Sequence, residues 1–303
     1  MIQILQSIPT ILMIVAPILI TAIGGMICER SGVVNIALEG LMGLGGCATA
    51  AAQTLLETYG MSNNLSVALA LLIGAAVGCL FSIIHAVAAI NLNADQTISG
   101  TGINLLATGV TIFASQILFN ADRTKEFRLG MHTDALGVYP SVYIAAIVVI
   151  LSWFILYKLP FGMHLRACGE HPAAAESVGI NVRKIRYIAV LTSGLLGGLA
   201  GGCVVLTQTI QYTSATINGR GFIALAAVSF GRWTPLGVTG ASLLFGTAQA
   251  FTVIATNFSS LKSIPTEVFN IFPYLITLIA LVLFSGKNYA PASDGKPYVK
   301  GAS

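Results

Sequence analysis

Long apolar stretches alternate with short polar ones along nearly the whole chain. A helix needs about 20 mostly apolar residues to cross a bilayer. Stretches near that length predict membrane-spanning helices at residues 8–27, 41–56, 66–90, 101–119, 141–157, 187–206, 236–255 and 269–285, and a further apolar stretch at 220–230 is too short to span unaided. We therefore expect an all-α integral membrane protein of eight or nine transmembrane helices, forming a single domain over residues 1–303.

Two polar interruptions fall at comparable places before and after the centre of the chain. Charges and glycines break the apolar pattern at residues 29–40 and again at 220–221. Ionised groups at membrane depth need a partner charge or a wet cavity, and paired broken helices in transporters lie beside the transport route. We expect broken helices in two pseudo-repeated halves, with Arg30 paired to Glu29 or Glu39. The alternative is an ordinary surface loop, and composition alone leaves both open.

The polar loop at residues 158–186 is the most basic segment between predicted spans. It carries five Lys or Arg residues against two Glu residues, whereas the loop at 120–139 carries three charges of each sign. By the positive-inside rule the 158–186 loop and the lysine-bearing tail at 286–303 face the cytoplasm, and the 120–139 loop faces outward. Within the basic loop, Pro172 suits the first turn of a short helix and Gly179 suits its end.

Composition excludes a soluble protein and several kinds of site. Of 303 residues, 55% are hydrophobic and only 9% are charged, where globular domains carry about 25% charged residues. The net charge of +4 is small and the basic residues cluster between spans, which disfavours nucleic-acid binding. The five cysteines show no C-x-x-C spacing and no nearby His, so neither a disulfide framework nor a metal site is expected.

Motifs for bond chemistry are missing from the sequence. A G-x-x-x-x-G-K-[ST] phosphate-binding loop does not occur, and neither does H-E-x-x-H or G-x-S-x-G. The four histidines are scattered singly. We expect no catalytic residues, no metal and no cofactor in this chain, and transport without bond chemistry is the simplest interpretation.

Several sequence blocks resemble one family. The chain reads ERSGVVNIALEG at 29–40, ADQTISG at 94–100, GEHPAAAESVGI at 169–180 and GRGFIALAAVSFGRWTPLG at 219–237. These blocks are similar to those of membrane permease subunits of bacterial ABC importers, of the type for nucleosides and simple sugars, related to permeases for ribose and branched-chain amino acids. Because they run from the first predicted helix to the last third of the chain, and GKPY at 295–298 also matches, the resemblance covers nearly the whole chain.

The resemblance implies a multi-pass subunit of the bacterial cytoplasmic (inner) membrane that is not itself an enzyme. It implies a separate ABC ATPase that binds ATP and Mg²⁺, a second permease subunit that we expect to be a related but different chain, an extracellular or periplasmic substrate-binding (lipo)protein, and surrounding lipid. The short helix would be the coupling helix that contacts the ATPase, with candidate residues Gly169, Glu170, His171, Pro172, Ala173, Ala174, Ala175, Glu176 and Gly179.

A nucleoside offers ribose hydroxyls and an uncharged base, so its route needs hydrogen-bonding groups and aromatic faces. Polar, charged or aromatic residues near the breaks are the candidates: Asn35, Glu39, Asp95, Gln96, Asn104, Gln208, Tyr212, Asn218, Arg220 and Phe222. Each is also of a type that helices use for structural hydrogen bonds. Simple sugars or branched-chain amino acids remain alternative substrates, and an ion-coupled secondary transporter is an alternative mechanism.

Overall fold

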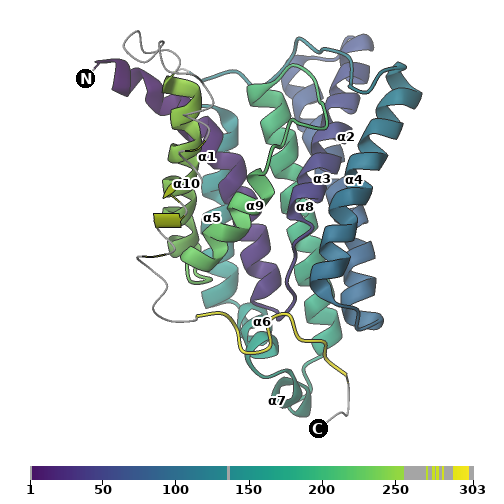
Figure 1. The fold of residues 1–303 in the computed structure, drawn as a ribbon, viewed down its shortest axis with the longest axis vertical. Coiled ribbons are helices and arrows are strands. Elements are labelled where there is room, and N and C mark those ends of the chain that lie inside the picture. The colour runs from purple at the N-terminus through teal and green to yellow at the C-terminus, as the bar shows by residue number, and fades with distance from the viewer. Residues whose placement is uncertain are drawn as a thin grey trace.

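The fold is known from a computed structural model that describes residues 2–134, 137–255 and 289–299, together with six single positions between 271 and 282. Helices make up most of it, and the described part contains no strand (Figure 1). In chain order the elements are α1 (Ile2–Glu29), α2 (Leu38–Thr58), α3 (Asn63–Ala86), the π-helical segment η1 (Val87–Asn91), α4 (Gln96–Phe119), α5 (Pro140–Lys158), α6 (Pro160–Glu170), α7 (Pro172–Ser177), α8 (Val182–Gln208), α9 (Arg220–Phe230) and α10 (Pro235–Ala255).

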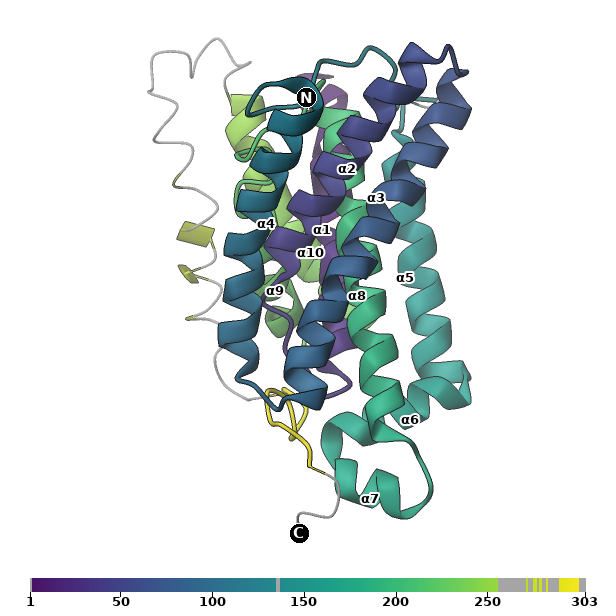
Figure 2. The same ribbon diagram turned by 90° about the vertical axis from the view of Figure 1, so that its right-hand side faces the viewer.

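Six helices of the described part are long and apolar enough to cross a membrane, which confirms an all-helical membrane protein. They are α1, α3 with η1, α4, α5, α8 and α10. The predicted span at 41–56 is not in this set and corresponds to α2. The stretch at 220–230, which the sequence predicts to be too short to span, forms the short α9. Both helices begin inside the bundle (Figures 1 and 2). The predicted span at 269–285 lies largely outside the described residues.

Helix α8 runs through the centre of the bundle, where α1, α2 and α3 pack around it (Figure 2). The contact is made by backbone as much as by side chains. A Cβ added to Gly198 of α8 would overlap the carbonyl of Gly74 in α3, and one added to Gly45 of α2 would overlap Gly198 itself. The small-x-x-x-small spacing of Gly194 and Gly198 thus serves close helix packing, as such spacing does in membranes.

The first polar interruption lies inside the protein and is not a surface loop. The chain between α1 and α2 is non-helical, yet Ser31, Val33 and Asn35 are fully buried within it. Irregular backbone at membrane depth is tolerated only where protein or a wet cavity surrounds it. The structure therefore decides between the two interpretations of residues 29–40 in favour of a broken helix.

The two ends of the bundle carry different segments. Helices α6 and α7 and the C-terminal tail lie at one end, and the N-terminus and the connection from α4 to α5 lie at the other (Figures 1 and 2). The basic loop and residues 289–299 of the tail, with Lys296, therefore share one end, and the charge-balanced loop lies at the opposite end (Figure 1). This is the arrangement that the charge pattern predicts.

We predict that Gly198→Ala lowers the free energy of unfolding by about 1–3 kcal/mol, because the added methyl meets fixed backbone rather than a movable side chain. Thermal unfolding of the purified protein in detergent measures the loss. Gly240→Ala in α10 is the matched control, because nothing lies within 4 Å of a Cβ built there. Equal melting temperatures for the two variants would contradict backbone contact at Gly198.

Candidate functional site

The N-terminal ends of α2 and α9 meet in the middle of the bundle, and Glu39 joins them. Glu39 lies in the first turn of α2. Its carboxylate accepts hydrogen bonds from the backbone N–H groups of Gly219 and Gly221, each at 2.7 Å, at the start of α9. Both helices direct the positive ends of their dipoles at this point, and a carboxylate there satisfies free N–H groups and offsets the charge. We call Glu39, Gly219, Arg220 and Gly221 the central junction.

Arg220 connects the central junction to the helix at the core of the bundle. Its guanidinium donates from Nη2 to Gln208 Oε1 at 2.7 Å and from Nη1 to the Thr216 carbonyl at 2.8 Å. Gln208 in turn donates to the carbonyl of Met13 in α1 at 3.3 Å. The junction is therefore held by hydrogen bonds to α8 and α1 as well as by Glu39.

Asn104 fixes the start of α2 from the other side. Its amide oxygen accepts from the Gly40 N–H at 2.8 Å, and its amide nitrogen donates to the Ile36 carbonyl at 2.9 Å. These backbone groups lie where α2 begins, so they have no partner within the helix. One α4 side chain thus replaces the hydrogen bonds that the broken helix lacks.

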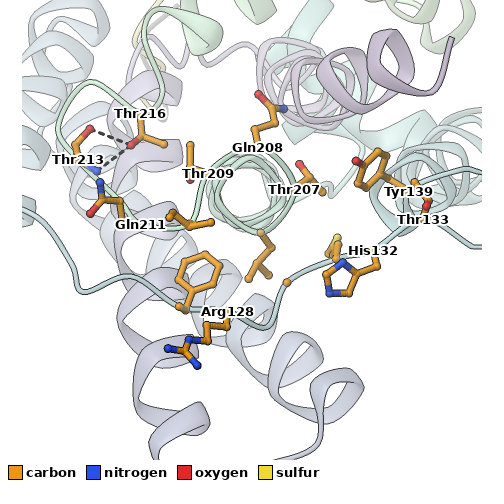
Figure 3. A pocket seen from close by; sticks show the side chains of 15 residues that line it. Arg128, His132, Thr133, Tyr139, Thr207, Gln208, Thr209, Gln211, Thr213 and Thr216 are labelled. Carbon is orange, nitrogen blue, oxygen red and sulfur yellow. Dashed lines mark hydrogen bonds between the residues drawn. The ribbon is translucent and has the colours of Figure 1, made fainter. Parts of the chain in front are cut away.

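A hollow of about 640 Å³ opens at the end of the bundle opposite α7. Its wall combines the C-terminal end of α8 and the chain that follows it with the segment around His132 (Figure 3). Gln208 and Thr216 both line this hollow and both bond Arg220. Gln208 and Thr216 therefore link the hollow to Arg220 of the central junction by hydrogen bonds.

Four of the sequence-predicted route residues come together here: Glu39, Gln208 and Arg220 with Asn104 beside them. Asn218 is exposed next to Gly219, and Phe222 of α9 is 49% exposed. Tyr212 is buried in the loop between α8 and α9, where its N–H donates to Thr124 Oγ1 at 2.9 Å.

The structure places three other candidates away from the central junction, each in a hydrogen bond within the chain. Asp95 caps α4 by accepting from the N–H groups of Thr97 and Ile98. Gln96 accepts from the Val34 N–H at 2.7 Å. Asn35 is fully buried and donates to Ser193 Oγ at 2.5 Å.

The expected pairing of Arg30 with Glu29 or Glu39 is replaced by contacts to a residue far along the chain. Arg30 Nε donates to the Trp233 carbonyl at 2.8 Å, and the Trp233 indole N–H donates to Glu29 at 2.5 Å. The two side chains meet through Trp233, which sits in the turn between α9 and α10. Sequence reasoning missed Trp233 because 204 positions separate it from Glu29.

The short helix of the basic loop forms as α7, with the features that the sequence predicts. Pro172 occupies its first position, and Gly179 takes a left-handed φ of 87° just beyond its end. His171 Nδ1 accepts from the Ala174 N–H at 3.2 Å, so the imidazole caps the helix. Ala175 is buried against the bundle, while Ala173 and Ala174 face outward.

The two glutamates of this region have partners within the chain. Glu176 accepts a hydrogen bond from the Tyr298 hydroxyl of the tail. Glu170 ends α6 and accepts from the Ala292 N–H at 3.4 Å. Gly169 lies directly against the backbone of Arg30, where a Cβ would overlap the Arg30 carbonyl. The α6–α7 region is thus joined to the non-helical segment at residues 30–37 between α1 and α2, which we call the first break.

We predict that Glu39→Gln lowers the free energy of unfolding by about 1.5–3 kcal/mol, because an amide loses charge-assisted bonds to two backbone N–H groups. Thermal unfolding in detergent measures it, with Glu126→Gln as the control for removing one exposed carboxylate. Equal melting temperatures for Glu39→Gln and Glu126→Gln would show that Glu39 does not hold α2 and α9 together.

Comparison with known proteins assigns the family. A family model described as "Branched-chain amino acid transport system / permease component" matches residues 7–281. The chain is 44% identical to the guanosine ABC transporter permease protein NupQ of Bacillus subtilis, over 99% of this chain and 98% of the relative. It is 38% identical to the nucleoside ABC transporter permease protein NupC of Lactococcus lactis, over 94% and 93%.

A more distant match widens the range of relatives. The ribose import permease protein RbsC of Escherichia coli is 31% identical over 70% of this chain and 64% of its own length. The resemblance that the sequence blocks indicated is therefore confirmed along almost the entire chain. NupQ and NupC are both ABC transporter permeases. The protein therefore belongs to the branched-chain amino acid transport system permease family.

Proposed function

We propose that this chain is a membrane-spanning permease subunit of an ATP-driven ABC importer that takes up nucleosides across the bacterial cytoplasmic membrane. One observation carries the proposal: two relatives whose names specify guanosine or nucleoside transport match at 44% and 38% identity over at least 94% of the chain. The ribose permease relative keeps simple sugars as the second candidate substrate class.

The geometry of the route supports an uncharged, hydrogen-bonding substrate. The 640 Å³ hollow lies within the 300–1,000 Å³ typical of small-molecule sites. It is lined mainly by hydroxyl, amide and apolar side chains, and its charged group is Arg128. From there the route reaches the central junction through Gln208 and Arg220. Amide and hydroxyl groups match the ribose and base of a nucleoside better than they match the charged ends of an amino acid.

The partners follow from the two ends of the bundle. A substrate-binding protein would deliver the nucleoside at the hollow, and an ABC ATPase, which carries ATP and Mg²⁺, would bind at the end formed by α6 and α7. A second, related permease would pack on α4, where Thr101, Gly102, Thr108 and Gly109 are exposed. Small residues on an exposed face suit close packing between membrane helices.

The mechanism links α7 to the central junction. ATP binding closes the two ATPase subunits, and their movement tilts α7 and the end of α6. Gly169 transfers this movement to Arg30 at the first break by direct backbone contact. Since α2 begins only eight residues later, a shift of the break reaches Glu39 and changes the contact between α2 and α9. Outward and inward openings then alternate.

The proposed function predicts ATP-dependent uptake of nucleosides by the complete transporter. Proteoliposomes holding both permeases, with ATPase and binding protein supplied, should accumulate radiolabelled guanosine, and excess unlabelled adenosine or uridine should compete while ribose and leucine should not. Competition by ribose but by neither nucleoside would show that the substrate is a simple sugar. Uptake that proceeds without ATP and follows an ion gradient would establish a secondary transporter instead.

Replacement of the outward-facing Ala174 tests the role of α7. We predict that Ala174→Lys leaves membrane insertion intact and abolishes transport-linked ATP hydrolysis, because a long charged side chain would hold the ATPase away from α7. Hydrolysis is measured with and without loaded binding protein in reconstituted vesicles. Asn64→Lys, a change at another exposed position in the first turn of α3, should leave both activities unchanged, because α3 begins at the end of the bundle opposite α7 (Figure 2). Normal stimulated hydrolysis by Ala174→Lys would remove α7 from the coupling role.

A further inference from the structure

The C-terminal tail, over residues 292–298, lies across the α6–α7 end of the bundle and is held there by specific bonds (Figures 1 and 2). The Ser293 N–H donates to the Gly169 carbonyl at 2.8 Å, and the Ser293 hydroxyl donates to the Glu170 carbonyl at 3.3 Å. The Tyr298 hydroxyl donates to Glu176 of α7. We call residues 292–298 the tail clasp, because they contact the end of α6 and α7 together.

Arg186 of α8 lies beneath the tail clasp and connects it to the first break. Only 1% of Arg186 is exposed. Its Nε donates to the Ser31 carbonyl at 3.2 Å and its Nη1 donates to the Lys296 carbonyl at 3.3 Å. Its guanidinium carbon also lies 5.9 Å from the centre of the Tyr298 ring, a cation–π distance. One buried side chain therefore bonds both non-helical segments at this end of the protein.

The backbone at the break is shaped to admit this arginine. Gly32 has a left-handed φ of 89°, and a Cβ there would lie 2.7 Å from Arg186 Nη2. It would also lie 3.2 Å from the Ser293 carbonyl oxygen. Only glycine combines this conformation with the space that both neighbours need. The break, Arg186 and the tail clasp thus pack as one unit.

Helix α7 has little attachment of its own. It is only six residues long, and Ala175 is its one buried residue. Helices this short are not stable alone and depend on contacts with the rest of the fold. The tail clasp supplies a second attachment through Tyr298. Asp294 of the tail is half-buried, and burial raises the pKa of its carboxyl to about 7.

We propose that the tail clasp transmits the movement of α7 to the first break, with Arg186 as the positioning residue between them. The inference rests on the proposed function and adds a second connection to the contact between Gly169 and Arg30. A tilt of α7 moves Tyr298 and the clasp, the Lys296 carbonyl moves with them, and Arg186 passes the displacement to Ser31. Without the clasp, ATP hydrolysis continues but less of it is converted into movement of the substrate.

The test compares Tyr298→Ala with wild type and with Val299→Ala, an adjacent tail residue that is 48% exposed, in the complete reconstituted transporter. Nucleoside taken up per ATP hydrolysed is measured alongside the amount of ATPase that co-purifies. We expect Tyr298→Ala to lower uptake per ATP by about fivefold or more, since coupling between sites typically amounts to 5–150-fold. ATPase binding should be unchanged, and Val299→Ala should match wild type.

Tyr298→Phe removes only the hydroxyl that bonds Glu176, so it gives the same test at smaller amplitude if Tyr298→Ala accumulates poorly. Wild-type uptake per ATP in both tyrosine variants would overturn the clasp and leave the proposed function standing. Loss of ATPase from either variant would also overturn it, because the clasp would then form the docking surface instead of transmitting movement. A wild-type complex without ATP-driven nucleoside uptake would overturn the proposed function itself.

Discussion

The fold depends on a carboxylate placed between two helix ends inside a membrane protein. Helices α2 and α9 both begin in the interior, and their free N–H groups and positive dipole ends point at each other. Glu39 satisfies N–H groups of α9 from the first turn of α2, and Arg220 keeps the site polar on the side of α8. The same interaction that makes broken helices tolerable also creates a polar centre halfway through an otherwise apolar bundle.

The two functional regions are connected because the first break extends from the α7 end of the bundle to this polar centre. Arg30, Ser31 and Gly32 contact the α6–α7 region and Arg186, and the same short segment leads directly into α2. Close glycine-to-glycine packing joins α2, α3 and α8. In the proposed mechanism, a displacement at the α7 end reaches the start of α2 through this segment.

The sequence predicts most of the fold because the bilayer imposes a length on apolar helices, and the long spans fall near their predicted positions. Pro172 and Gly179 likewise mark α7 through local backbone rules. The placement of α2 needs the structure, because the charges and glycines at residues 29–40 fit a broken helix inside the bundle and a surface loop equally well.

Long-range partners explain the remaining differences. Glu39 and Arg220, which their charge at membrane depth singles out, meet at the central junction. Arg30 and Glu29 instead bond Trp233, a residue that no local pattern connects to them. Asp95, Gln96 and Asn35 show the opposite case, since helix capping and buried backbone groups use the same side chains as a substrate would. The charge pattern places Arg186 in a basic loop between two apolar stretches, whereas the structure buries it in α8, where its contacts come from two distant segments.

We expect ATP to change the access of solvent to the polar centre. The most direct measurement is the rate at which a membrane-impermeant maleimide labels Asn218→Cys, exposed beside Gly219, in a reconstituted transporter whose native cysteines have been replaced. We expect non-hydrolysable ATP to change this rate several-fold, whereas a cysteine at exposed Asn64 should react at the same rate with and without the nucleotide. Identical rates for Asn218→Cys with and without nucleotide would contradict it.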